Sequence, residues 1–349
     1  MAERRLIYDL DRTELGQTLE GWGQPAYRAN QVWHALYREL IQSPTEITTL
    51  PQGLRERLDE SFTFRSLTPN RQLRSSDGET EKTLLTTPDG QAFEAVLMRY
   101  LRRRTACIST QAGCAMGCVF CATGQMGLKR QLSSGEIVEQ VLLFARQLTG
   151  EGDHLTNVVV MGMGEPFHNY DATMQALDRL NDAAGFNFGA RRFTVSTVGL
   201  VPKIRQFTDE RRPYNLAISL HAASDDLRAK LLPIAKSYPL EVLLQAAHDY
   251  VTRSGRRVTF EWALIQDVND GVDQAERLAD WVQGLLCHVN LIPLNPTHGF
   301  AGGPTTRARA AAFQSVLTDH GVPCTIRVRR GIDIQAGCGQ LATQSKAAR

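Results

Sequence analysis

From Thr105 onward, short apolar runs alternate with longer segments in which apolar residues recur every three to four positions. The short runs predict buried strands, and the periodic segments predict amphipathic helices. Strands that alternate with helices pair in parallel, because right-handed crossovers return the chain to the same edge of the sheet. We expect strands at 105–110, 156–162, 192–197, 215–220, 257–264 and 287–293, with helices near 134–148, 170–182, 200–208, 238–250 and 271–284.

This alternation predicts the α/β class, but six strand–helix units are too few for a closed eight-stranded barrel. We therefore expect a partial, open (β/α)6 barrel, with a doubly wound sheet as the alternative. Ser133 and Glu136 form a capping-box pattern that predicts the start of the first helix. In either fold, functional groups gather at the carboxyl ends of the strands.

The chain before Thr105 has two further patterns. Residues 1–65 hold polar, helix-like segments such as 24–37, in which Pro25 is placed to open a helix. Residues 66–104 are strand-rich, and Asp89-Gly90 predicts a hairpin turn between 82–85 and 92–97. We expect a small helical N-terminal accessory domain (1–65), a β extension (66–104) and an α/β core with a C-terminal tail (105–349).

Cys114, Cys118 and Cys121 are separated by three and then by two intervening residues in the loop after the first core strand. A 4Fe-4S cluster is normally held by four thiolates, so three would leave one iron open to a ligand such as S-adenosylmethionine. This spacing is typical of the radical S-adenosylmethionine superfamily. Zinc is an alternative, but it requires a fourth ligand and the nearest histidine is His154. A second alternative is three packed, unligated thiols.

Small and polar residues recur where the other core strands end. Taken singly, each could be a turn or a cap, and His221 alone more often indicates a core histidine. Their recurrence at one edge favours a nucleoside-bearing cofactor such as S-adenosylmethionine. The candidates are Gly164 and Glu165 after the second strand, Ser196 after the third, Ser219, Leu220 and His221 after the fourth, and Asn295 after the sixth.

The composition of the chain predicts where the protein is located in the cell, but it does not decide whether the protein binds RNA. Seven cysteines, an odd number, and a charged N-terminus without a secretory pattern predict a reducing cytoplasm. No apolar stretch approaches the length of a membrane span, so we expect no membrane association. Only six of the 39 basic residues are lysine. Arginine suits RNA phosphates and bases, although a GC-rich genome would produce the same bias.

Four segments together resemble the RlmN-type rRNA and tRNA adenine-C2 methyltransferases, whose sister group is the Cfr-type adenine-C8 enzymes. The resemblance covers nearly the whole chain. It rests on the residues from Cys107 to Cys121, on Met161-Gly-Met-Gly-Glu-Pro166, on Ala217-Ile-Ser-Leu-His-Ala222, and on Gly331-Ile-Asp-Ile-Gln-Ala-Gly-Cys-Gly-Gln-Leu341.

The resemblance implies a radical mechanism that uses one 4Fe-4S cluster and two S-adenosylmethionine molecules. It makes Cys338 an S-methylcysteine intermediate and Cys107 the thiolate that resolves it through a transient disulfide. It also makes Glu94 the proton acceptor. The implied partners are 23S rRNA, tRNA and an electron donor of the flavodoxin or ferredoxin type, acting on a monomer.

Three other functions stay open at this stage. Pro166 and the run 291–296 favour carbon 2, with carbon 8 as the alternative. A radical enzyme for a small molecule would not need the pair Cys107 and Cys338. A non-catalytic RNA-binding protein with a structural metal would hold no iron or sulfide. Cys287 and Cys324 lie in apolar strand-like contexts and are interpreted as structural thiols.

Overall fold

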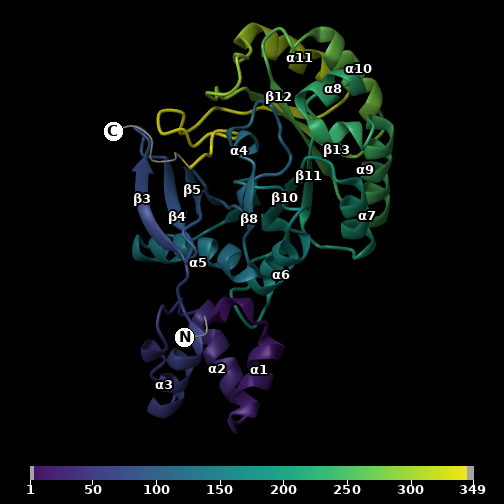
Figure 1. Cartoon of the computed structure of the whole chain (residues 1–349). Helices are drawn as coiled ribbons and strands as arrows, with labels where there is room; N and C mark the ends of the chain where they lie inside the picture. Colours follow the sequence, from purple (N-terminus) through teal and green to yellow (C-terminus); the bar gives the residue numbers. More distant parts are fainter. Residues whose placement is uncertain (1–3, 344–349) are drawn as a thin grey trace.

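The computed structural model describes residues 4–343 and contains a helical module, a β extension and a parallel core (Figure 1). The module lies below the core in this view. Asp11 accepts from the N–H of Glu14, whose side chain accepts from Asp11 N–H, so a capping box starts the first helix. The module comprises β1 (Arg5–Leu6), α1 (Arg12–Gly21), α2 (Tyr27–Tyr37), α3 (Gln52–Ser61) and β2 (Phe62–Thr63), with 3-10 turns at Ile7–Asp9 and Pro44–Glu46.

Polar contacts attach this module to the core helices α5 (Ser134–Gly150) and α6 (Tyr170–Asn181). The guanidinium of Arg146 on α5 donates to the Tyr8 hydroxyl at 2.9 Å and to the Leu40 carbonyl at 2.7 Å. Asp9 Oδ1 accepts from the N–H of Gly135 at 2.6 Å. The module is therefore fixed along α5, with contacts at its first turn and in its C-terminal half.

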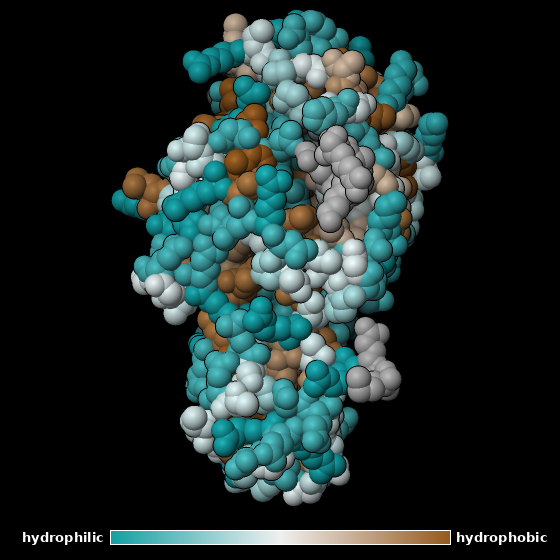
Figure 2. Space-filling view, turned by 60° about the vertical axis from the view of Figure 1, so that its left-hand side comes forward, coloured by the Kyte–Doolittle hydropathy of each residue, from teal (hydrophilic) through white to brown (hydrophobic). Residues whose placement is uncertain are grey.

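The β extension continues the core sheet, because β5 pairs antiparallel with the first core strand, β6 (Arg103–Cys107). Gly90, at a φ of 81°, lies in the predicted turn between the second and third strands. The outermost strand exposes almost only polar side chains, which discourages pairing with another sheet (Figure 2). The extension consists of β3 (Thr68–Arg74), β4 (Thr80–Thr86) and β5 (Ala92–Tyr100).

The core is the parallel part of a ten-stranded sheet with the order β14-β13-β12-β11-β10-β9-β6-β5-β4-β3. Its strands follow in sequence order, as six β/α units require, and the six predicted strands are all present. The remaining core strands are β9 (Asn157–Val160), β10 (Phe193–Thr197), β11 (Asn215–Ser219), β12 (Val258–Leu264), β13 (Cys287–Pro293) and β14 (Cys324–Ile326).

The predicted core helices are present, and the capping box of Ser133 and Glu136 opens the first of them. Among the elements that were not predicted are α11 (Arg307–Asp319) and β14, which has only three residues. The first follows a Gly- and Pro-rich segment and has a weakly amphipathic sequence, and the second is too short to show alternation. The other helices are α7 (Val201–Asp209), α8 (Asp225–Leu231), α9 (Leu240–Ser254) and α10 (Val272–Val282), with 3-10 turns at Ala190–Arg192 and Pro233–Lys236.

Within residues 4–343, no helix has both the length and the apolar character needed to cross a membrane.

Candidate active site

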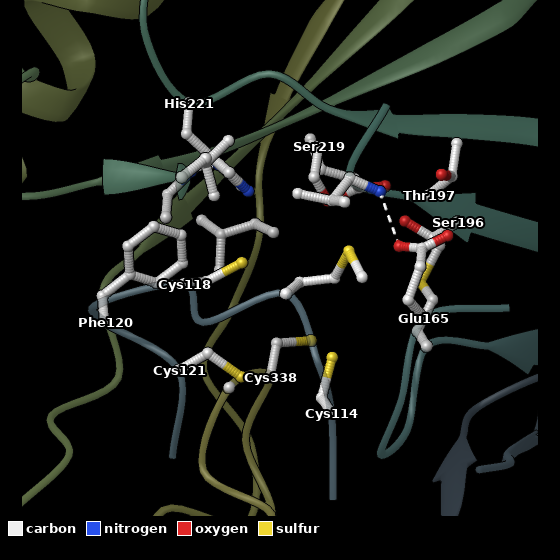
Figure 3. A pocket seen from close by; sticks show the side chains of 18 of the residues that line it. Cys114, Cys118, Phe120, Cys121, Glu165, Ser196, Thr197, Ser219, His221 and Cys338 are labelled. Carbon is white, nitrogen blue, oxygen red and sulfur yellow. Dashed lines mark hydrogen bonds between the residues drawn. The ribbon is translucent and has the colours of Figure 1, made fainter. Parts of the chain in front are cut away.

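A cavity opens at the carboxyl ends of the core strands, where the sequence predicts functional groups (Figure 3). It contains about 950 Å³ of space free of protein atoms, including the part open to solvent. Of the predicted residues, the cavity is lined by Cys114, Cys118, Cys121, Gly164, Glu165, Ser196, Ser219, His221 and Cys338.

The cysteine loop is compact because two glycines allow its backbone segments to approach closely. It connects the short strand β7 (Gln111–Gly113) to the one-turn helix α4 (Ala122–Gln125), and β8 (Leu128–Gln131) then pairs back with β7. A Cβ on Gly113, which has a φ of 76°, would meet the Gly127 carbonyl oxygen. A Cβ on Gly124 would lie 2.9 Å from the backbone nitrogen of Cys118. The fold therefore requires glycine at both positions.

The three thiols of this loop all face the cavity, as an iron–sulfur cluster requires. No group of three or more His, Cys, Asp or Glu side chains within residues 4–343 is arranged to hold one metal ion. Ligands of a cluster bind different irons, so they need not converge on one point. Burial raises the pKa of Cys114 to about 12 and that of Cys118 well above its ordinary value. Cluster binding would displace these protons, because the thiolate is the ligand.

The turn after β9 presents the carboxyl group of Glu165 to the cavity. Its two oxygens accept from the N–H groups of Phe167 at 2.9 Å and Val198 at 2.8 Å, and the second bond is drawn in Figure 3. Burial raises the pKa of Glu165 to about 7. Among the described residues no cationic side chain forms an ion pair with it, so a ligand ammonium group would supply the missing charge.

Gly164 positions this carboxylate, because the turn lies directly against Gln111. The φ of Gly164 is 102°, and a Cβ there would lie 2.6 Å from Gln111 Cβ. The side-chain oxygen of Gln111 in turn accepts from the Glu165 N–H at 2.8 Å. A side chain at position 164 would therefore displace the neighbour that orients Glu165.

His221 is neutral and fixed in one tautomer. Its Nδ1 accepts from the N–H of Ala263 at 2.9 Å, so the ring proton lies on Nε2. Burial and the nearby Arg228 lower its pKa to about 3. The side chain of the predicted contact Leu220 lies instead in the hydrophobic core, outside the cavity lining.

The C-terminal tail brings Cys338 to the cysteine loop. The N–H of Ala122 donates to the Gly339 carbonyl at 2.8 Å, and the Thr123 hydroxyl donates to the Leu341 carbonyl at 2.6 Å. Asn295 does not line the cavity itself, but its amide donates to the Cys338 carbonyl at 3.0 Å. Figure 3 shows the Cys338 sulfur beside those of Cys121 and Cys114.

Cys107 and Glu94 lie next to this cavity, and neither forms part of its lining. Cys107 ends β6 opposite Val96 of β5. Burial and, to a smaller extent, the nearby Cys338 raise its pKa to about 12. Glu94 lies on β5, where burial raises its pKa and Lys82 lowers it. All seven cysteines lie within residues 4–343 and are free thiols, Cys287 and Cys324 included.

Three further polar residues at the site were not predicted from the sequence. Arg327, just after β14, lines the cavity and lowers the pKa of the Cys338 thiol, opposing the effect of burial. Glu261 on β12 has one buried oxygen without a hydrogen-bond partner among the described residues. A carboxylate within an otherwise apolar strand indicates a buried polar group that needs a partner, so the sequence could have identified Glu261 as a site residue. Lys82 gave no such signal, because four consecutive residues of β4 are buried and do not alternate.

Comparisons with known proteins agree with this geometry. Residues 108–282 match the Radical SAM superfamily, and residues 6–63 match the ribosomal RNA large subunit methyltransferase N-terminal domain. The chain is 51% identical to dual-specificity RNA methyltransferase RlmN 1 of Myxococcus xanthus, covering 96% of this chain and 93% of that one.

It is 48% identical to a probable dual-specificity RNA methyltransferase RlmN of Chloroflexus aurantiacus, with 97% and 93% coverage. A radical SAM methyltransferase from Sphaerobacter thermophilus superposes with a TM-score of 0.94 at 50% identity, covering 97% of this chain and 99% of that structure. The open α/β barrel, the three-cysteine loop and this near-full-length similarity together show that the chain belongs to the RlmN family of dual-specificity RNA methyltransferases, within the radical S-adenosylmethionine superfamily.

Proposed function

We propose that this chain methylates carbon 2 of an adenine in 23S rRNA and in tRNA, through a methyl group carried on Cys338. The observation that carries the proposal is the position of Cys338. The tail holds this thiol beside the cysteine loop on one side and near Cys107 on the other. A thiol that only stabilised the fold would not need a place on the wall of an open cavity.

Cys114, Cys118 and Cys121 would hold a 4Fe-4S cluster, and Glu165 would receive the ammonium group of S-adenosylmethionine. When bound, the cluster and S-adenosylmethionine supply a 5′-deoxyadenosyl radical that removes a hydrogen atom from a methyl group. We assign the remaining cofactor contacts to Gly164, Ser196, Ser219, Leu220, His221 and Asn295. Leu220 would act through its backbone, because its side chain is in the core.

The protein's own groups would then perform the transfer. The S-methyl carbon of Cys338, after losing a hydrogen atom, bonds to carbon 2 of the base, and the one electron that the adduct loses would be accepted by the cluster held by the cysteine loop. Glu94 accepts the proton from carbon 2. The Cys107 thiolate attacks the Cys338 sulfur, so that an S–S bond forms as the S–CH2 bond breaks. The released carbon takes the electron pair and a proton, which completes the methyl group.

An arginine-rich rim beside the thiols supports an RNA substrate. The guanidinium groups of Arg103 and Arg330 lie 4.9 and 4.6 Å from the centre of the Tyr100 ring. Tyr100 is close enough to Cys107 and Cys338 for their charges to influence its pKa. Guanidinium and aromatic planes bind phosphates and unstacked bases. We assign RNA recognition also to domain 1–65 and the β extension 66–104, catalysis to 105–349 together with Glu94 of the extension, and reduction to a flavodoxin or ferredoxin.

Two cysteine variants test the function. Cluster-loaded protein is reduced anaerobically with S-adenosylmethionine and unmodified RNA, and the products are analysed by mass spectrometry. Wild-type protein should yield adenosine methylated at carbon 2. Cys107→Ala should yield RNA attached covalently to Cys338, because addition proceeds and release does not. Cys338→Ala should yield neither product nor adduct, because it has no methyl carrier.

The asymmetry between the two variants decides the assignment. A passive disulfide pair would give the same phenotype on either substitution. Turnover by Cys107→Ala without an adduct would remove the resolving role, and a methyl group found on Cys107 would reverse the two roles. Product methylated at carbon 8 would show that the chain has the adenine-C8 activity of the Cfr-type sister group. Cys287→Ala is the matched control, because this buried thiol lies outside the cavity and should leave the product yield unchanged.

A further inference from the structure

A buried ion pair joins two strands of the β extension beside the catalytic thiols. Lys82 Nζ on β4 lies 3.0 Å from Glu94 Oε1 on β5. Both side chains are less than one-tenth exposed. Burying two charges is costly unless each is paired and its remaining hydrogen-bonding capacity is used.

The remaining capacity of both residues is used on the C-terminal tail. Lys82 Nζ donates to the Gln335 carbonyl at 3.1 Å. Glu94 Oε2 accepts from the Ala342 N–H at 3.0 Å. Gln335 lies three residues before Cys338, and Ala342 lies four residues after it. The ion pair therefore holds both ends of the loop whose middle carries the methyl-bearing thiol.

This arrangement occupies the carboxylate that is assigned to accept a proton. Oε1 is paired with Lys82, and Oε2 is covered by the tail at Ala342. A base must come within hydrogen-bond reach of the proton it removes. Oε2 keeps a second lone pair, but the Glu94 side chain is only 7% exposed, so an RNA base can reach this oxygen only when the tail at Ala342 moves away. Lys82 can stay on Oε1.

We propose that Lys82 and Glu94 form a latch that closes the loop 335–342, and that opening of this latch at Ala342 exposes Glu94 to the RNA base, with Lys82 as the positioning residue. This inference rests on the proposed function, because it takes Glu94 as the proton acceptor and Cys338 as the methyl carrier. It adds a residue with no assigned role and couples the position of the thiol to the availability of the base.

Other contacts of the tail show what simple anchoring of this segment looks like, without a link to the proposed base. The tail is also held by the N–H of Ala122 on Gly339 and by Thr123 on Leu341, both from the cysteine loop. The Ser76 N–H binds Asp333 at 2.7 Å, ahead of Gln335. These contacts hold the tail without involving the base. Of the tail contacts among the described residues, those of Lys82 and Glu94 alone connect the position of the tail to proton transfer.

A double-mutant cycle tests the coupling. The variants Lys82→Met, Glu94→Gln and the double variant are loaded with cluster, and single-turnover formation of methylated adenosine is measured. Lys82→Met should lower the rate by about 10- to 100-fold, since a general base contributes roughly 10²- to 10⁴-fold and would be only partly lost. In the Glu94→Gln background, the same substitution should change the rate by less than about twofold. Lys82→Arg should restore most of the activity, because it keeps the charge.

A purely structural role for Lys82 would lower the rate equally in both backgrounds, and that result would overturn the latch. A Lys82→Met enzyme that forms methylated adenosine at the wild-type rate would also overturn the latch. If Lys82→Met fails to fold, Lys82→Arg and Lys82→Gln give the comparison between a charged and a neutral donor. Lys203→Met, on α7 across the core, is the matched control. Wild-type protein that forms no methylated adenosine would instead refute the proposed function.

Amide hydrogen exchange tests the opening itself. The Ala342 amide should exchange slowly in RNA-free wild-type protein, where it binds Glu94. In the RNA adduct of Cys107→Ala it should exchange at least about tenfold faster, because Glu94 then faces the base. Equal protection in the two states would show that the latch stays closed during the reaction.

Discussion

Gly164→Ala is the sharpest test of the cofactor pocket, because the structure gives both the strain and its consequence. At a φ of 102°, alanine is strained at this position wherever its Cβ lies. The added Cβ would also lie 2.6, 2.7 and 2.8 Å from Cβ, Cγ and the backbone nitrogen of Gln111. Backbone strain costs about 1–3 kcal/mol. Overpacking costs about 1–3 kcal/mol more.

The expected loss of stability is therefore about 2–6 kcal/mol in total. Unfolding entropy of about 2.1 cal/mol/K per residue over 349 residues converts this loss into a Tm about 3–8 °C lower. Displacement of Gln111 would also disturb Glu165. Losing one charged hydrogen bond of about 1.5–3 kcal/mol weakens S-adenosylmethionine binding roughly 10- to 150-fold.

Thermal unfolding and titration calorimetry of anaerobic, cluster-loaded protein measure these two quantities. Gly150→Ala is the matched control, because it lies at the end of α5 with no atom within 4 Å of the added Cβ. It should raise stability by about 0.4–1 kcal/mol. A Gly164→Ala protein with the Tm and affinity of the wild type would refute the close approach of this turn to Gln111.

Replacing Cys114, Cys118 or Cys121 by Ala should abolish the brown chromophore and S-adenosylmethionine cleavage; iron and sulfide analysis checks this, and a full cluster in any single variant would contradict the assignment. For Glu165, S-adenosylmethionine affinity should fall as pH falls through about 7, because burial raises its pKa to that value and the protonated carboxyl cannot pair with an ammonium group. Glu165→Gln should bind roughly 10- to 150-fold more weakly at pH 8. In this variant, the affinity measured by calorimetry should no longer change as pH passes through about 7. A change that persists would show that a group other than Glu165 titrates there.

Local features of this protein follow from short stretches of sequence. The spacing of Cys114, Cys118 and Cys121 confines three thiols to one loop. The hairpin at Gly90 and the capping box of Ser133 and Glu136 involve residues within a few positions of one another. The alternation of apolar runs and amphipathic segments predicts the parallel core, because each strand pairs with its neighbour in the sequence.

Contacts between distant segments required the tertiary structure. Lys82 and Glu94 lie on the two strands of the predicted hairpin, but they meet Gln335 and Ala342 only because the tail folds back onto the β extension after β14. The burial of Lys82 could not be inferred, since both faces of β4 are covered at this point and no alternation marks its inner face.

Arg327 likewise reaches the cavity through a three-residue strand that carries no periodic signal. Hydrophobic periodicity reports which side of an element is buried, but it does not report which segment covers that side. The sequence alone therefore determined the core and the cysteine loop, and the tertiary structure decided which charges lie near Cys107 and Cys338.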